Sequence, residues 1–208
     1  MLFRSLTRPE GRNERLAERL RELGYEVVVR PVVRVEPIET GPVDLDGYDW
    51  LLLTSATGAD ELKGRATGRP LQVAAIGRAT AEAWGAVDLV PRVSSQEGLL
   101  AELPRPAGRV LFAGAEGARS LLADELDADV VVLYRTVPVP AVEPFEAELA
   151  VVASASAARA LAALGLGIPV VSIGPETTAA AEASGLAVAA EAQTPDLDGL
   201  VSAVAGAG

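Results

Sequence analysis

The chain offers a narrow set of side chains for chemistry, because it contains no histidine and no cysteine. This composition excludes thiol nucleophiles, imidazole acid–base catalysis and the two commonest zinc ligands. A carboxylate site for a hard cation is the alternative left open, but no loop carries the spaced carboxylates of a calcium-binding EF-hand, and we expect no metal. Catalysis would have to come from hydroxyl, acidic and arginine side chains, from the single Lys63, or from backbone dipoles.

Tyr134 is the first candidate among these side chains. It is one of only three tyrosines, and it lies near the end of an extended run from Val130 to Pro140. A run of this length can pass between two domains, which would place the phenol beside a ligand. An aromatic plug at a domain edge is the alternative interpretation.

Two Gly-x-x-Thr turns form a second candidate. Gly77 and Thr80 follow one apolar run, and Gly174 and Thr177 follow another at a matched position. Glycine lets the chain turn closely, and the first turn of the next helix presents free N–H groups that suit a carboxylate or phosphate. A plain strand-to-helix turn with a capping hydroxyl is the alternative for each copy.

Four more residues fall where strands are expected to end. Ser55 follows the buried run 49–53, Ser154 lies in the matching run 149–156, and each could be a helix cap or a ligand contact. Thr7 and Arg8 follow the first strand. In a parallel α/β sheet, ligands bind beyond the carboxyl ends of the strands.

The elements that must position these residues occur twice. Residues 1–103 and 109–206 read as two copies of one unit, each beginning with a strand–helix–strand pattern and then a long extended run. The first such run, 25–37, contains Pro31 and Pro37, which exclude a central strand over its whole length. We therefore expect an edge strand that becomes a connector. Further along, we expect a short helix around 59–64 and a brief strand at 87–90.

This arrangement predicts an α/β protein with two parallel-sheet domains, the first of them discontinuous. Domain 1 would contain residues 1–34 plus 141–208, and domain 2 residues 38–132. Segments 35–37 and 133–140 would be linker strands, with Tyr134 in a cleft between two lobes. Two sequential domains divided near residue 106 are the simpler alternative.

Charge and hydropathy limit the partners. The net charge of −11 argues against nucleic acid, which favours a basic surface. No apolar run approaches the roughly 20 residues of a membrane span, and residues 1–14 carry charges rather than a targeting segment. We expect no membrane association and a cytoplasmic location.

Taken together, the motifs resemble those of the uroporphyrinogen-III synthase family over nearly the whole chain. The resemblance rests on their order, spacing and doubling, and the matching pieces are Thr7-Arg8-Pro9, Leu53-Thr54-Ser55-Ala56, Ile76-Gly77-Arg78-Ala79-Thr80-Ala81, Tyr134-Arg135-Thr136, Ala153-Ser154 and Ile173-Gly174-Pro175-Glu176-Thr177. It implies two flavodoxin-like domains joined by a two-stranded linker. The segment between Ser55 and Leu71 is short for the family.

The resemblance also implies a function. Members of the family are lyases of tetrapyrrole (heme) biosynthesis that close hydroxymethylbilane to uroporphyrinogen III, with inversion of ring D, loss of water and no cofactor. Tyr134 would assist departure of the hydroxyl group. The remaining matches would bind substrate, namely Thr7, Arg8, Ser55, Gly77, Thr80, Ser154, Gly174 and Thr177. We expect a monomer that receives its substrate from hydroxymethylbilane synthase.

Two other functions stay open at this point. A two-lobed, non-catalytic binding module for an anionic small molecule would need the same architecture. A flavodoxin-like redox protein is less favoured, because the loops lack the aromatic residues that usually enclose a flavin.

Overall fold

The chain folds into two compact α/β units. The computed structural model describes residues 3–38, 41–140, 142–143 and 145–207. Unit 1 contains residues 1–35 and 136–208, and unit 2 contains residues 36–135. Residue 141, where the second segment of domain 1 was expected to begin, lies outside the described residues.

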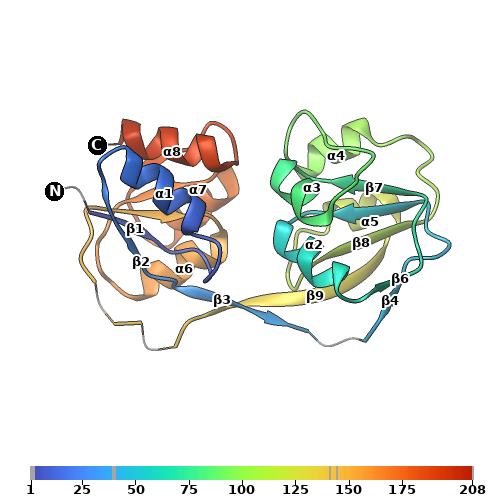
Figure 1. Cartoon of the computed structure of the whole chain (residues 1–208), viewed down its shortest axis with the longest axis horizontal. Helices are drawn as coiled ribbons and strands as arrows, with labels where there is room; N and C mark the ends of the chain where they lie inside the picture. Colours follow the sequence, from blue (N-terminus) through green and yellow to red (C-terminus); the bar gives the residue numbers. More distant parts are fainter. Residues whose placement is uncertain (1–2, 39–40, 141, 144, 208) are drawn as a thin grey trace. The chain divides into compact units, whose positions relative to one another are not determined.

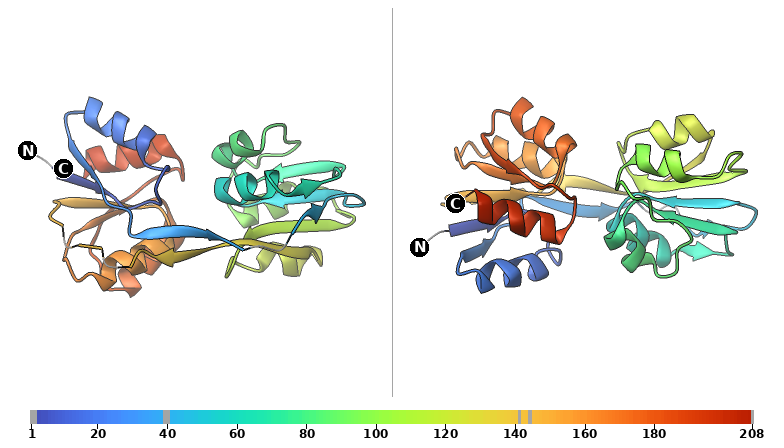
Figure 2. Two further views of the ribbon diagram at one scale, coloured as in Figure 1. Left: turned by 60° about the horizontal axis from the view of Figure 1, so that its bottom comes forward. Right: turned by 90° about the horizontal axis from the view of Figure 1, so that it is seen from above.

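Unit 1 is a five-stranded parallel sheet with helices on both faces (Figures 1 and 2). Its elements are β1 (Phe3–Leu6), α1 (Glu14–Glu22), β2 (Glu26–Val29), β10 (Leu149–Val152), α6 (Ala155–Ala163), β11 (Val170–Ser172), α7 (Pro175–Ala183), β12 (Val188–Glu191) and α8 (Leu197–Gly206). The strand order is β12-β11-β10-β1-β2. Counted along the unit this is 2-1-3-4-5, the flavodoxin-like order.

Alternation along β10 explains how both faces of this sheet are covered. Leu149 and Val151 join a core with α1 and α8, whereas Ala150 and Val152 join a core with α6 and α7. A strand buried on both faces must be apolar throughout, which is why the run lacks the polar alternation of a surface strand.

Unit 2 repeats this architecture with its first strand–helix–strand segment placed last. Its elements are β3 (Val33–Pro37), β4 (Val43–Asp44), β5 (Trp50–Leu53), α2 (Ala56–Lys63), β6 (Ala66–Thr67), β7 (Gln72–Ala75), α3 (Arg78–Trp84), α4 (Gln96–Glu102), β8 (Val110–Ala115), α5 (Leu121–Leu126) and β9 (Asp129–Pro138). The order β9-β8-β5-β7 matches β2-β1-β10-β11 of unit 1, and β3 is added at the edge beside β9. Helices α4 and α5 pack on one face of the sheet, and α2 packs against α3 (Figure 1).

The expected strand at 87–90 is reduced to a single bridge between Ala74 and Leu89. The side chain of Asp88 explains part of this reduction. Its carboxylate accepts a hydrogen bond from the main-chain N–H of Val73 at 2.7 Å, in addition to main-chain bonds that join Leu89 to Val73 and Ala75. Pro91 follows, and proline cannot donate to a ladder.

The two long extended runs form a two-stranded linker. Strand β2 is at the edge of the first sheet and β3 at the edge of the second, so the connector predicted for residues 25–37 is confirmed. The N–H of Ile38 donates to the carbonyl of Leu133, and the N–H of Val139 donates to that of Val32, which is the crossed numbering of an antiparallel pair. Both boundaries between the units fall inside this ladder.

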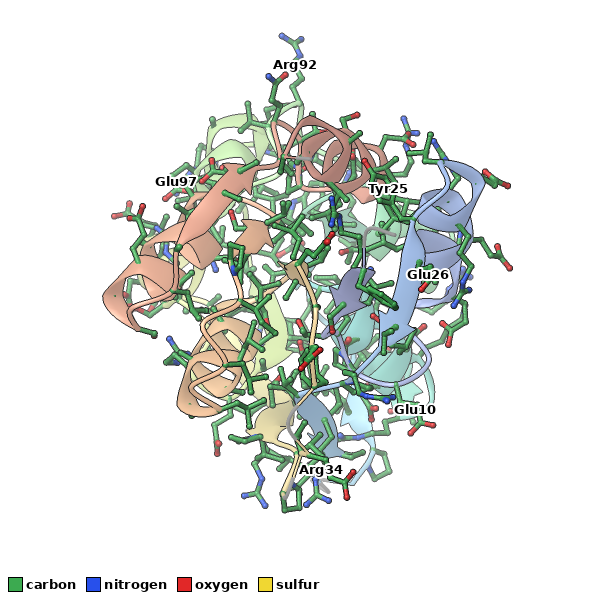
Figure 3. The ribbon with its side chains drawn as sticks, turned by 90° about the vertical axis from the view of Figure 1, so that its left-hand side faces the viewer. Glu10, Tyr25, Glu26, Arg34, Arg92 and Glu97 are labelled. Atoms are coloured by element: carbon green, nitrogen blue, oxygen red, sulfur yellow. The ribbon has the colours of Figure 1, made fainter. Side chains whose placement is uncertain are left out.

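Charged groups hold the amino ends of the strands. In unit 1, buried Arg4 contacts Glu148 at 3.3 Å and lies over the ring of Tyr25, which is labelled in Figure 3. In unit 2, Arg109 and the hydroxyl of Tyr48 both bond to Asp129, at 3.0 and 2.8 Å. The hydrogen bond from Tyr48, and then that from Arg109, lower the pKa of the Asp129 carboxyl from its ordinary value. These contacts lie at the ends of the strands opposite to the candidate site.

Within the described ranges, no helix combines the length and the apolar character that a membrane span requires.

Candidate functional site

The predicted site residues gather at the carboxyl ends of the strands, in both units. In a 2-1-3-4-5 sheet, the strand order reverses between the first and third strands, and ligands bind beside that reversal. The reversal falls between β8 and β5 in unit 2 and between β1 and β10 in unit 1. Ser55 lies two residues after the end of β5, and Thr7 and Ser154 follow β1 and β10.

Ser55 caps helix α2. Its backbone is extended, and its Oγ accepts a hydrogen bond from the N–H of Gly58 at 2.9 Å. The helix expected around 59–64 therefore starts earlier, at Ala56, because the cap satisfies an N–H group that the first turn leaves free.

A β-bulge directs Tyr134 toward this helix. Val130 pairs with Phe112 and Val131 with Ala113, but the register then shifts and Tyr134 pairs with Ala115. Phe112 packs in the core with α4 and α5. Paired residues of neighbouring strands share a face, and successive residues alternate between faces. Without the extra residue Leu133, Tyr134 would share the face of Phe112; the bulge moves it to the opposite face.

The consequence is a direct contact between two predicted site residues. The hydroxyls of Ser55 and Tyr134 are 2.9 Å apart, although the residues are separated by 79 positions in the sequence. Tyr134 is 7% exposed, so the phenol is largely shielded from water. A serine oxygen has one proton to donate and two lone pairs. With one lone pair given to Gly58, Ser55 can donate its proton to the phenol oxygen.

Gly58 completes this arrangement, and sequence reasoning did not single it out. A Cβ at this position would lie 3.0 Å from the Ser55 Oγ and 3.7 Å from a ring carbon of Tyr134. The absence of a side chain therefore lets the capping hydroxyl and the phenol ring approach helix α2 together. A glycine three residues after a capping serine, inside a helix, was the available sequence signal.

In unit 1 the matched positions carry a different set of contacts. Ser154 caps α6 by accepting from the N–H of Ala157 at 3.1 Å, as Ser55 does for α2. Thr7 is fully buried, and its hydroxyl donates to the carbonyl of Val151 at 2.6 Å. Thr7 thus joins the carboxyl ends of β1 and β10 at the reversal point.

Arg8, the next residue, is a half-buried cation beside another cation. Burial, and then the charge of Arg12, lower the pKa of the Arg8 guanidinium from its ordinary value, and Glu14 opposes this. The side-chain amide of Asn13 donates to the carbonyls of Arg8 and Pro9, at 3.0 and 3.1 Å, and so fixes the turn. A bound anion would relieve the repulsion between the two guanidinium groups.

The two Gly-x-x-Thr turns have the same geometry. In each, the glycine carbonyl accepts the N–H groups of the threonine and of the residue after it: Gly77 from Thr80, Gly174 from Thr177. Both threonines are buried, at 4% and 5% exposure. Helix α3 has only seven residues and α7 has nine, so the second turn leads into the longer helix.

The residues therefore form two groups, one in each unit. Ser55 and Tyr134 are brought into hydrogen-bonding contact, and Thr7 and Ser154 lie on the adjoining strand ends β1 and β10. Among the described residues, no three histidine, cysteine, aspartate or glutamate side chains are arranged to hold a metal ion.

These features define a two-domain α/β protein of duplicated flavodoxin-like units with hydroxyl groups at the strand ends. A family model described as uroporphyrinogen-III synthase HemD matches residues 14–202. The chain belongs to this family. The matched region includes Ser55, Tyr134 and Thr177, and it begins after Thr7 and Arg8.

Two curated relatives are similar over part of the chain. The putative uroporphyrinogen-III synthase of Methanocaldococcus jannaschii is 26% identical over 145 residues, which cover 63% of this chain and 60% of the relative. The uroporphyrinogen-III synthase of Synechococcus elongatus is 27% identical over 157 residues, covering 66% and 58%. The chain thus spans about 60% of the length of these two relatives.

Solved structures are similar in fold over the whole chain. A mutant uroporphyrinogen III synthase from Thermus thermophilus aligns with a TM-score of 0.60 at 17% identity, covering all of this chain and 98% of that one. The wild-type form aligns with a TM-score of 0.51 at 18% identity, again over 100% and 98%. The predicted fold class, two flavodoxin-like domains with a two-stranded linker, is confirmed.

Proposed function

We propose that this protein is a uroporphyrinogen-III synthase that closes hydroxymethylbilane to uroporphyrinogen III, inverting ring D and releasing water. The observation that carries the proposal is the hydrogen bond between Ser55 and Tyr134, in a chain of the HemD family. It supplies a shielded proton donor at the carboxyl edge of a flavodoxin-like sheet.

The first chemical step is loss of the hydroxyl group from the hydroxymethyl carbon. The C–O bond breaks, the departing oxygen takes the phenol proton of Tyr134, and water leaves. The lone pair of the adjoining pyrrole nitrogen compensates the electron deficiency on the methylene carbon, giving a cationic azafulvene that keeps its N–H proton. A general acid placed in this way typically contributes 10²–10⁴-fold to the rate.

Ser55 has a defined part in this step. When Tyr134 has given up its proton, the Ser55 O–H donates to the phenolate oxygen, and the N–H of Gly58 donates to the Ser55 oxygen in turn. The charge that develops on the phenol is thus met by a hydrogen bond already in place, which needs no reorganisation during the reaction.

Ring closure then depends on how the linear substrate is held. The substituted pyrrole carbon of ring D attacks the electrophilic methylene carbon of the azafulvene, a spiro intermediate forms and rearranges, and the proton released at the end returns to Tyr134. The flexible linear tetrapyrrole must be folded before the ring can close. Positioning of reacting groups can lower a reaction barrier by at most about 7–11 kcal/mol. We propose that both units bind the substrate, through Thr7, Arg8, Ser154, Gly174 and Thr177 in unit 1 and through Ser55, Gly77 and Thr80 in unit 2.

Charge supports an anionic substrate at unit 1. Hydroxymethylbilane carries many carboxylates, and the Arg8–Arg12 pair is a place where one of them would lower the electrostatic energy of the free protein. A carboxylate bound there would raise the pKa of Arg8 toward its ordinary value.

The test is a coupled assay with product analysis. Hydroxymethylbilane is generated in situ by hydroxymethylbilane synthase, the purified protein is added, and the products are oxidised and separated as type I and type III uroporphyrin. Spontaneous closure yields type I, so each sample contains its own background. We expect mostly type III. Type I alone from a folded protein would overturn the proposal and favour the binding module.

A further inference from the structure

A chain of three hydrogen-bonded side chains lies at the carboxyl edge of unit 1. The hydroxyls of Ser172 and Thr178 are 2.6 Å apart, and the Thr178 hydroxyl donates to the carboxylate of Glu191. Because threonine has a single hydroxyl proton, Ser172 must be the donor in the first bond. The chain runs in one direction, from Ser172 through Thr178 to Glu191.

The three residues come from three elements. Ser172 ends β11 and is fully buried, Glu191 ends β12, and the two are register partners in the sheet. Thr178 lies in the first turn of α7, next to Thr177. These hydrogen bonds therefore connect the first turn of α7 to the carboxyl ends of β11 and β12, at the edge of the sheet where the proposed site lies.

Unit 2 provides an internal comparison. Its strands β9-β8-β5-β7 match β2-β1-β10-β11 and it has the same Gly-x-x-Thr turn, but Ala75 and Ala81 stand where Ser172 and Thr178 do. The residue after the paired Leu89 is Val90, at the place of Glu191. An equivalent turn thus forms without any of these polar groups, so the fold itself does not require them.

We propose that Ser172, Thr178 and Glu191 are positioning residues that hold Thr177 and the first turn of α7 in the geometry that receives the substrate. This inference rests on the function proposed above. Hydrogen bonds to a charged group are stronger than those between neutral groups, which suits a contact that must fix a helix start. The two Gly-x-x-Thr turns therefore differ: the turn of unit 1 is fixed by these three side chains, and the turn of unit 2 has alanine and valine at the matched positions.

Four variants separate positioning from general stability. Thr178→Val and Glu191→Leu remove hydrogen bonds between the three side chains at similar side-chain volume. Thr178→Ser and Glu191→Gln keep these hydrogen bonds. Steady-state rates of type III formation give KM and kcat for each variant. Amide hydrogen exchange of Thr177 and Thr178, whose N–H groups both bond to Gly174, reports the order of the turn without reference to activity.

We expect the first two variants to raise KM about tenfold, to change kcat less than about threefold, and to speed exchange of these two amides about tenfold. The serine and glutamine variants should behave like the wild type in all three measurements. An active wild type whose Thr178→Val form keeps its KM would overturn the inference and leave the proposed function standing. If the wild type forms no type III, exchange decides: equal rates in the valine and serine variants overturn the inference, and faster exchange in valine supports the positioning of the turn.

Discussion

Replacing Ser55 by alanine removes two interactions, whereas replacing its counterpart Ser154 removes one. Both serines cap a helix by accepting from a main-chain N–H, at 2.9 and 3.1 Å. Only Ser55 is also bonded to a phenol, that of Tyr134. The comparison therefore isolates the contact on which the candidate site depends.

The expected magnitudes follow from these contacts. Loss of a serine cap costs about 1 kcal/mol, and loss of one buried side-chain hydrogen bond costs about 1 kcal/mol more. Ser154→Ala should thus lower the free energy of unfolding by about 1 kcal/mol, and Ser55→Ala by about 2. Tyr134→Phe should cost about 1 kcal/mol, and combined with Ser55→Ala the total should stay near 2, a coupling of about 1 kcal/mol.

The chain carries a convenient probe for this experiment. Both tryptophans, Trp50 and Trp84, lie in unit 2 with Ser55 and Tyr134. Urea unfolding followed by tryptophan fluorescence reports on unit 2 and yields the double-mutant cycle. Far-UV circular dichroism reports on both units and gives the effect of Ser154→Ala.

Equal destabilisation by Ser55→Ala and Ser154→Ala, together with a coupling below about 0.3 kcal/mol, would contradict an energetic contact between Ser55 and Tyr134. That result would mean that Ser55 acts only as a helix cap and that Tyr134 is held by other contacts. The proposed role of Ser55 in the proton transfer would then have no structural basis.

Three other perturbations give equally definite expectations. Gly58→Ala puts a methyl group 3.0 Å from the hydroxyl of Ser55, so kcat should fall at least about tenfold. The higher helix propensity of alanine should keep the change in unfolding free energy within about 1 kcal/mol. A wild-type kcat would show that the close approach of Ser55 and Tyr134 to helix α2 is unimportant. Thr7→Val removes the hydroxyl that donates to a buried carbonyl of β10 and should lower the free energy of unfolding in urea by about 1–3 kcal/mol. Thr7→Ser keeps the hydroxyl and should leave this free energy nearly unchanged. Equal decreases in the two variants would contradict this role of Thr7. Because the pKa of Asp129 is lowered in the folded state, the ionised carboxylate stabilises the protein at neutral pH, and this stabilisation is lost as the pH falls through that pKa. The melting temperature of Asp129→Asn should therefore lie below that of the wild type at pH 7, and the difference should become smaller toward pH 3. A difference in melting temperature that does not change with pH would argue against a charge effect.

Much of the fold could be predicted from repetition in the sequence. The prolines in 25–37 exclude a central strand, and the matched run 130–140 indicates that the chain crosses between two domains twice. Strand β2 at one sheet edge and β3 at the other follow this expectation. The weak strand at 87–90 could not be judged in this way, because the Asp88 side chain accepts the main-chain N–H of Val73 beside the few main-chain bonds of Leu89.

The site could be predicted only in part. Ser55 and Tyr134 are recognisable as candidates, but their contact depends on a bulge that adds Leu133 to one strand and moves every later side chain to the other face. Periodicity cannot reveal such a shift, although Gly114 beside it was a weak signal. The Ser172–Thr178–Glu191 chain joins three elements, and single-strand patterns contain no information about contacts of this kind.

The most direct test of the proposed mechanism compares Tyr134→Phe with the wild type in the coupled assay, at matched and verified folding. We expect the phenylalanine variant to form type III product at least about 100-fold more slowly, so that spontaneous type I product predominates. Wild-type rates of type III formation by this variant would contradict the claim that the phenol proton of Tyr134 drives departure of the hydroxyl group.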